Sequence, residues 1–368
     1  MSSESEIRQF LEATDEHLTA ALLDYASLMP VSLINIGKLA LSAPGKVMSA
    51  VPQIQRTGVS VPSPLPRWPL YVIEAHRAGS AYTADAWGEA LPGAVAVEIA
   101  MSAADLLDEL ADEDPSPVVE RYGPGQALNT GNLMLVMSQQ VLLRAAQGGN
   151  ERYLAALTAL QEMLVEAAVG QHLDMLYDRM APDEVTLEMS ADVTAKKAGA
   201  LIAGAWRVGA VLSGAEEPVV DLLARLGREI GGFAQLSNDL EAVLPLDISA
   251  NDVALMEEGG PAGLKTDLRL RKRTLPVVFT LRDEAEAPNS LQRAFSDLDY
   301  AATIDEDALR RAIVEAGGVQ FAQLVMEVHA QNIMQLLGEL EALRPGASEA
   351  LAYLLPVRIE RGEGAAEQ

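Results

Sequence analysis

Apolar residues recur every three to four positions over most of this chain, and almost no segment alternates between apolar and polar residues as a half-buried strand does. The pattern therefore predicts an all-α protein that folds as a single large helical bundle. Residues 5–27 are predicted to form an amphipathic helix, whereas residues 43–69 hold six prolines and are expected to be irregular. The predicted helices of the bundle cover residues 69–79, 86–113, 125–146, 150–179, 187–213, 217–245, 272–284, 305–315 and 317–342.

These elements divide the chain into two regions. Residues 1–68 are expected to pack on the core as an N-terminal helix followed by the proline-containing segment, and residues 69–368 to form the helical domain. The composition agrees with a helical fold, because Ala and Leu abound while aromatic residues make up only 4% of the chain.

The charge and composition exclude several classes of function. The net charge of −26 argues against a nucleic-acid partner, since phosphate binding needs clustered Lys and Arg, and against docking on anionic lipid. The chain has no cysteine, which excludes disulfides, thiolate nucleophiles and Cys–zinc sites. The longest uncharged stretch, Tyr122 to Leu143, carries several Gln and Asn residues and predicts no membrane span. With a polar N-terminus unlike a signal peptide, a cytoplasmic protein is expected.

An acidic cluster closes the apolar helix predicted over 86–113. Asp108 and Asp112 are four residues apart and share one helix face, and Glu109 lies about 100° around the helix. Carboxylate oxygens at this spacing suit Mg²⁺, which leaves the rest of its coordination shell to water and substrate phosphate. Taken alone, the same cluster is more typical of a solvated helix end in an acidic protein, since runs of charged residues usually lie in solvent.

Two further polar stretches carry candidate chemistry. Gln235, Asn238 and Asp239 lie late in an otherwise apolar helix, where the last two could ligate a metal ion or simply form a polar helix end. Residues 265–276 are the densest positive run in a strongly negative chain. A cationic loop that enters a helix can hold phosphate oxygens, and surface solubility is the alternative explanation.

Read in order, these stretches resemble the trans-isoprenyl diphosphate synthase family, and the resemblance extends from about residue 69 to 361. It implies the all-helical isoprenoid synthase fold, shared with class I terpene cyclases. The Ala316-Gly317-Gly318 segment resembles the family's C-terminal region. The matching motifs are Asp108–Asp112 for the first DDxxD, Gly170–Asp174 for GQxxD, Lys197–Leu201 for KTGAL, Gln235–Asp239 for FQxxDD and Asp267–Pro276 for DLxxGKxTLP.

The resemblance implies Mg²⁺ as the cofactor. Three of the family's aspartates are replaced: one in the first motif by Glu109, and two in the second motif by Asn238 and Ala242. The implied metal ligands are Asp108, Glu109, Asp112, Asn238 and Asp239.

The resemblance also implies how the substrate is held. A prenyl diphosphate would be ionised as Mg²⁺ neutralises the departing diphosphate, and the apolar bundle would shelter the carbocation from water. The implied diphosphate-binding residues are Lys197, Lys272, Arg121 and Gln235. The implied catalytic residues are Asp108, Asp112, Asp239 and Lys197. The expected partner besides the substrate is a second copy of the chain, in a homodimer.

One departure from the family leaves the reaction open. The family's GGKRxRP motif, which holds isopentenyl diphosphate, has Arg67-Trp68-Pro69 as its nearest remnant. A second diphosphate without a Lys/Arg clamp is bound poorly. Three functions therefore remain: transfer of the prenyl group to an acceptor, cyclisation as in a class I terpene cyclase, or a regulatory or binding role without catalysis.

Small residues precede the first acidic motif. In proteins that this sequence resembles, the positions one turn before the motif form the floor of the prenyl pocket, and here they are Ala103 and Ala104, with Ala100 one turn further back. An open pocket predicts a substrate of geranylgeranyl length or longer. Close helix packing is the alternative reason for small residues here.

Overall fold

The computed structural model describes residues 18–25, 27–29, 31–41, 68–82, 86–112, 116–244, 267–282, 289–297, 300 and 304–356. Within these ranges the regular elements are helices and no strand occurs, so the predicted all-α class is confirmed. Residues 18–25 are helical, as predicted, whereas the rest of the predicted helix before them and the proline-rich residues 43–67 lie outside the described residues. The proposed division at residue 68 stays a prediction.

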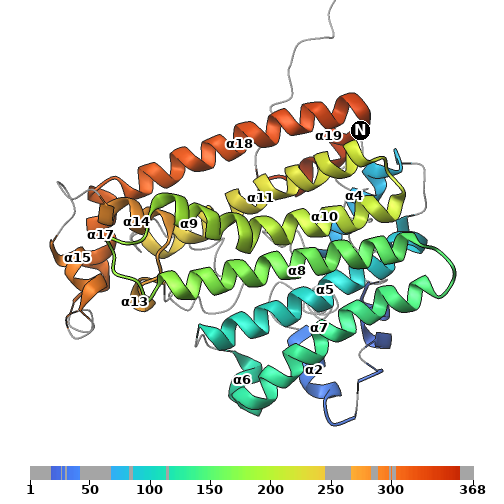
Figure 1. Ribbon diagram of the computed structural model, residues 1–368, viewed down its shortest axis with the longest axis horizontal. Coiled ribbons are helices and arrows are strands. Elements are labelled where there is room, and N and C mark those ends of the chain that lie inside the picture. Colours follow the sequence, from blue (N-terminus) through green and yellow to red (C-terminus); the bar gives the residue numbers. More distant parts are fainter. Residues whose placement is uncertain are drawn as a thin grey trace, which may run out of the picture.

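Long helices run across the molecule side by side and form the bundle (Figure 1). They are α4 (Trp68–Gly79), α5 (Ala86–Ala111), α7 (Pro124–Ala146), α8 (Arg152–Tyr177), α10 (Ala200–Ser213), α11 (Glu217–Val243) and α18 (Gly318–Leu343). Their bounds agree with the apolar periodicity to within a few residues.

Shorter helices gather mostly at one end of the bundle, where α8 ends (Figure 1). They are α9 (Leu187–Thr194), α13 (Asp267–Leu270), α14 (Leu275–Arg282), α15 (Asn289–Ser296) and α17 (Glu306–Glu315) at that end, with α2 (Ile34–Leu41), α6 (Pro117–Tyr122) and α19 (Ala347–Leu351) elsewhere. Buried side chains of α13, α14, α15, α17 and α18, with those at the end of α11, form a second hydrophobic cluster there, which includes Leu281, Leu291 and Ile313.

The structure departs from the predicted helices in three ways. The helix predicted over 187–213 is interrupted by a π turn, Ala195–Gly199, which separates α9 from α10. The helix predicted over 272–284 begins only at Leu275, because Lys272 to Thr274 are not helical. The helices α2, α6, α13, α15 and α19 were not predicted. Helix α6 starts with Pro117, which is favourable in the first helical turn.

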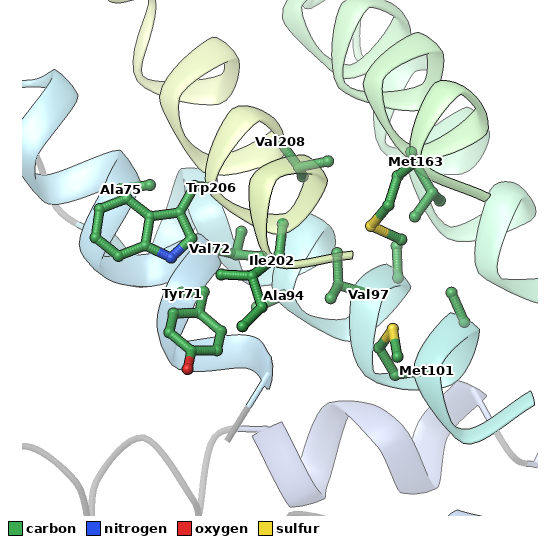
Figure 2. Close-up of a cluster of buried hydrophobic side chains, with 14 of the residues drawn as sticks. Tyr71, Val72, Ala75, Ala94, Val97, Met101, Met163, Ile202, Trp206 and Val208 are labelled. Carbon is green, nitrogen blue, oxygen red and sulfur yellow. The ribbon is translucent and has the colours of Figure 1, made fainter. Parts of the chain in front are cut away.

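Helix α10 lies at the centre of the bundle and packs against α4, α8 and α11. Side chains from α4, α5, α8 and α10 form one buried cluster, in which Tyr71 lies beside the fully buried Trp206 and Met101 and Met163 lie at the other side (Figure 2). Each large apolar side chain buried in this way stabilises the fold by about 1.5–3 kcal/mol relative to an exposed one. The main core therefore lies in the middle of the bundle and holds the long helices in place.

Two helices, α5 and α8, are long and apolar enough to cross a membrane by length and composition alone. The apolar window of α5 is 72% buried, as expected of the core helix of a bundle. The window of α8 is only 28% buried, so its apolar character is not explained by the core. The predicted absence of a membrane span stays a prediction.

The close contact of α10 with α4 gives a test of this packing. A Cβ at Gly209 would lie 2.0 Å from the Val72 carbonyl oxygen, whereas one at Gly338 on α18 would meet open space. We expect Gly209→Ala to destabilise the protein by about 2 kcal/mol or more. Gly338→Ala should instead stabilise it by about 0.5–1 kcal/mol, through helix propensity alone. Urea unfolding measures both, and equal effects of the two variants would contradict the tight α4–α10 contact.

Candidate functional site

Carboxylates from α5 and α8 meet a lysine from the π turn at the end of the bundle. The Lys197 ammonium lies 3.1 Å from Asp108 Oδ1 and 3.1 Å from Asp174 Oδ2. The Lys197 and Asp174 side chains are about one-fifth exposed, and that of Asp108 is 39% exposed. The structure thus brings together the first acidic motif, the GQxxD motif and the KTGAL motif.

A second ion pair stands beside the first. Lys272, which precedes α14, donates to Asp112, the residue that follows α5. Both side chains are largely buried, at 13% and 8% exposed. Asp112 and Lys272 are 160 residues apart in the chain, so the pair depends on the tertiary fold.

Gly170 allows the π turn to approach α8. A Cβ at this position would lie 2.6 Å from the Lys197 backbone nitrogen, so no larger residue fits without a shift. Gly170 is four residues before Asp174, on the same helix face. The close backbone contact therefore brings Lys197 within reach of the Asp174 carboxylate.

Residue Arg273 fixes the loop that carries Lys272. Its backbone nitrogen donates to Asp178 Oδ1 at 3.0 Å, and its carbonyl accepts from Ser190 Oγ at 3.0 Å. Arg273 is only 5% exposed, and its guanidinium donates to the Met180 and Arg271 carbonyls, each at 2.9 Å. The loop is thereby tied to α9 and to the end of α8.

The same loop holds Arg271 in the left-handed region, with φ of 58°. A side chain in this region costs on the order of 1 kcal/mol, because Cβ is crowded by the backbone. The family pattern DLxxGKxTLP has glycine at this position, which would adopt the conformation freely. The hydrogen bonds made by Arg273 fix the loop next to Lys272 and so hold Arg271 in this strained conformation.

The electrostatics of the cluster reflect crowded negative charge. Burial and the neighbouring Asp174 carboxylate raise the pKa of Asp178 to about 7. Burial also raises the pKa of Asp108, although Lys197 opposes that shift. Burial alone would lower the pKa of Lys197, but the carboxylates of Asp174 and Asp108 outweigh it, and the pKa is raised. Lys197 is therefore held as an ammonium ion.

The two residues of the second acidic motif differ in their burial. Asp239 is 3% exposed and accepts a hydrogen bond from Gln235 Nε2 at 2.8 Å, whereas Asn238 is exposed. None of the contacts described joins this pair directly to the Lys197 cluster.

Two other predicted residues lie at the edge of the site. Glu109 is half-buried beside Asp108, and Arg121 is exposed on α6, where its guanidinium stacks 5.6 Å from the ring centroid of Tyr122. Among the described residues, no hydrogen bond or ion pair joins Arg121 to the carboxylates. Its role in binding diphosphate stays a prediction.

Among the described residues, no three Asp, Glu or His side chains are grouped as metal ligands, and Asp108 and Asp112 contact lysines instead. The donors nevertheless fit a hard divalent cation, since they are carboxylate oxygens, and those of Asp108 and Asp112 come from the end of one helix. The predicted metal role stays a prediction.

Some residues of this site were not predicted. Asp178, Ser190 and Arg273 carry no signal on their own, but Asp174 and Asp178 repeat the four-residue spacing of Asp108 and Asp112, and that spacing could have pointed to them. Gln171 is also notable, because both polar atoms of its amide are buried without a hydrogen-bond partner among the described residues. It lies one turn before Asp174.

The alanines before the first motif lie in the core. Ala100 and Ala103 are fully buried, and Ala104 is partly buried and packs against the same cluster. This placement agrees with close helix packing and with a pocket wall alike. The prenyl-pocket assignment stays a prediction.

Solved structures share this arrangement of helices. A polyprenyl synthase from Caulobacter crescentus CB15, complexed with calcium and isoprenyl diphosphate, gives a TM-score of 0.72 at 19% identity and covers 95% of this chain and 98% of that one. A polyprenyl synthetase from Streptomyces coelicolor A3(2) gives 0.68 at 24% identity, with 94% and 98% covered. The fold is therefore that of the polyprenyl synthases.

The sequence comparisons lead to the family. The sequence model of the polyprenyl synthetase family matches residues 69–312, and the chain belongs to this family. A (2E,6E)-farnesyl diphosphate synthase from Mycobacterium tuberculosis is 31% identical over 237 residues. The match spans 62% of this chain and 62% of the length of that relative. A geranylfarnesyl diphosphate synthase from Aeropyrum pernix is 25% identical over 288 residues, 75% of this chain and 84% of the relative. The resemblance seen in the motifs is thus confirmed.

The raised pKa of Asp178 predicts a pH-dependent stability. Between pH values of about 4 and 7 the folded protein keeps a proton on Asp178 that the unfolded chain has lost, so stability falls as the pH rises through this window. Asp178→Asn removes the titration and keeps an acceptor for the Arg273 amide. In buffer with EDTA, we expect the variant to exceed wild type by about 1 kcal/mol or more at pH 8, and the two to converge toward pH 5. Urea unfolding over this range tests it; a difference independent of pH would contradict the assignment.

Proposed function

We propose that this protein ionises an allylic prenyl diphosphate with the help of Mg²⁺ and transfers the prenyl group to an acceptor. The observation that carries the proposal is the meeting of Asp108, Asp112 and Asp174 with Lys197 and Lys272 at one end of an apolar bundle. Membership of the polyprenyl synthetase family supports the same reaction. The calcium and isoprenyl diphosphate bound by the Caulobacter relative support a divalent cation as the link between carboxylates and substrate.

The residues of the cluster have complementary parts in this reaction. Asp108, Asp112 and Asp239 would hold the ion, with Glu109 and Asn238 as further oxygen donors, and the ion would supply positive charge as the C–O bond breaks. Lys197 and Lys272 would donate hydrogen bonds to diphosphate oxygens once the substrate competes for their carboxylate partners. Their ammonium groups compensate the negative potential that would otherwise repel a diphosphate from a chain of net charge −26.

The acceptor is the part of the proposal that the family alone does not decide. The Lys/Arg clamp for a second diphosphate has no clear counterpart in the sequence, which favours an acceptor other than isopentenyl diphosphate or an internal alkene. Incubation of the protein with Mg²⁺ and prenyl diphosphates, with and without isopentenyl diphosphate, separates these reactions. A longer diphosphate indicates elongation, a terpene hydrocarbon or alcohol indicates cyclisation, and absence of turnover contradicts an enzymatic role.

A homodimer is proposed because α8 exposes an apolar stripe. Leu154, Val165, Val169 and Leu176 are 44–65% exposed and, at successive intervals of 11, 4 and 7 residues, lie along one face of α8, with Gln161 between the first two. The stripe holds no charged side chain, so a second copy can pack on it despite the net charge. Light scattering tests the dimer, and a monomeric mass at micromolar concentration would contradict it.

The cytoplasmic location expected from the sequence is likewise proposed.

Removal of a carboxylate tests the site. We expect Asp108→Asn to lower turnover by about a hundredfold or more, because charge stabilisation at the reacting centre is lost while the shape is kept. Asp221→Asn is the matched control, since Asp221 is an exposed carboxylate on α11 paired only with Arg225 among the contacts described. Turnover is measured by release of diphosphate at saturating Mg²⁺. Full activity of a folded Asp108→Asn variant would exclude Asp108 from the site.

The chain length of the substrate gives a second test. With alanine at 100, 103 and 104, we propose a substrate of geranylgeranyl length or longer, since each added CH₂ that is buried contributes about 0.8 kcal/mol. Affinity for prenyl thio-diphosphates should therefore rise from geranyl to geranylgeranyl. Ala104→Phe should reverse that order by filling the pocket floor, while turnover of geranyl diphosphate is retained as the internal control. An unchanged order in the variant would exclude these alanines from the pocket.

A further inference from the structure

We propose that Arg228 is a positioning residue for the proposed site: it clamps the π turn and thereby sets the position of Lys197. The inference rests on the proposed function, because Lys197 is assigned there to the diphosphate. Arg228 itself touches none of the carboxylates of the cluster in the contacts described. It acts through the backbone of the turn.

The clamp joins three elements. From α11, the Arg228 guanidinium donates to both carboxylate oxygens of Glu166 on α8, at 2.8 and 3.1 Å. The same guanidinium donates to the Ala195 carbonyl, the first residue of the π turn, at 3.3 Å. The planar guanidinium presents several N–H groups in a fixed geometry, which a single ammonium group cannot reproduce.

The π turn needs such support because its own hydrogen bonding is uncommon. Ala195 accepts from the Ala200 amide, five residues on, in place of the usual four. If the turn relaxed to α-helical spacing, one residue fewer would fit and the side chains would rotate by about 100° relative to their neighbours. Lys197 lies in the middle of the turn, so such a change would move its ammonium away from Asp108 or Asp174.

A neighbouring ion pair provides the contrast. Arg207 on α10 lies 3.7 Å from Glu162 on α8, one turn before Glu166, and both side chains are about half exposed. This pair resembles the Arg228–Glu166 pair in composition and exposure. No described contact links it to the π turn, so its loss removes a surface ion pair and nothing more.

A double-mutant cycle between Arg228 and Lys197 tests the inference. The cycle compares wild type with Arg228→Met, Lys197→Met and the double variant. The first measured quantity is the dissociation constant of a farnesyl thio-diphosphate in the presence of Mg²⁺. The second is the pair kcat and KM, where turnover is measurable. If Arg228 acts through Lys197, Arg228→Met weakens binding and lowers kcat about tenfold or more, and the double variant is no worse than Lys197→Met alone. Arg207→Met leaves each of these quantities at the wild-type value.

The alternative outcomes separate this inference from the proposed function. Losses that multiply in the double variant would overturn the positioning role and leave the function intact. A Lys197→Met variant that binds and turns over normally would overturn the role assigned to Lys197 and the inference with it. If Arg228→Met fails to fold, Glu166→Gln loosens the same clamp and replaces it in the cycle. Arg228→Lys keeps the charge but loses the bidentate geometry, and full rescue by it would overturn the clamp.

Discussion

The structure depends on how several carboxylates are kept together at a half-buried helix end. Four aspartates from α5 and α8 lie around Lys197, Lys272 and the Arg273 loop, and like charges at such distances repel strongly where water is partly excluded. Burial is the main cause of the raised pKa of Asp178, and the neighbouring Asp174 carboxylate adds to it. A site with residual negative potential is suited to a divalent cation, and through it to a diphosphate.

Local irregularities in the fold serve this arrangement. Both lysines come from irregular backbone: Lys197 from a π turn, and Lys272 from a loop with a residue at positive φ, Arg271. Each irregularity is held by side-chain hydrogen bonds to backbone carbonyls, from Arg228 in the first case and from Arg273 in the second. The cost of the unusual backbone is met by packing elsewhere, which is the usual pattern at functional sites.

The sequence predicted the helices well and the site in part, for physical reasons that differ between residues. Apolar periodicity locates α5 and α11 because their buried faces are long and continuous, and it locates α8 because apolar residues recur along its whole length. Periodicity says nothing of the π turn, whose residues Ala195 to Gly199 have ordinary helix-forming composition. The short helix α6 was missed because its burial is limited to Val118. Asp108, Asp112 and Lys272 could be recognised from motif and charge contrast. The roles of Arg273 and Arg228 could not, since an arginine that binds distant carbonyls looks in sequence like any surface arginine.

Helix α8 connects the proposed site to the proposed dimer interface. Asp174 contributes to the Lys197 cluster, and Leu176, two residues later and so about 200° around the helix, is exposed on the opposite face. A rigid helix that is packed on one face by the π turn and on the other by a second copy would have little freedom to move its carboxylates. The apolar stripe of α8 would then act on the site without contacting it, because it restricts the helix from which Asp174 and Asp178 project. Such a dimer would also cover the exposed apolar face of α8 in a chain whose net charge is −26.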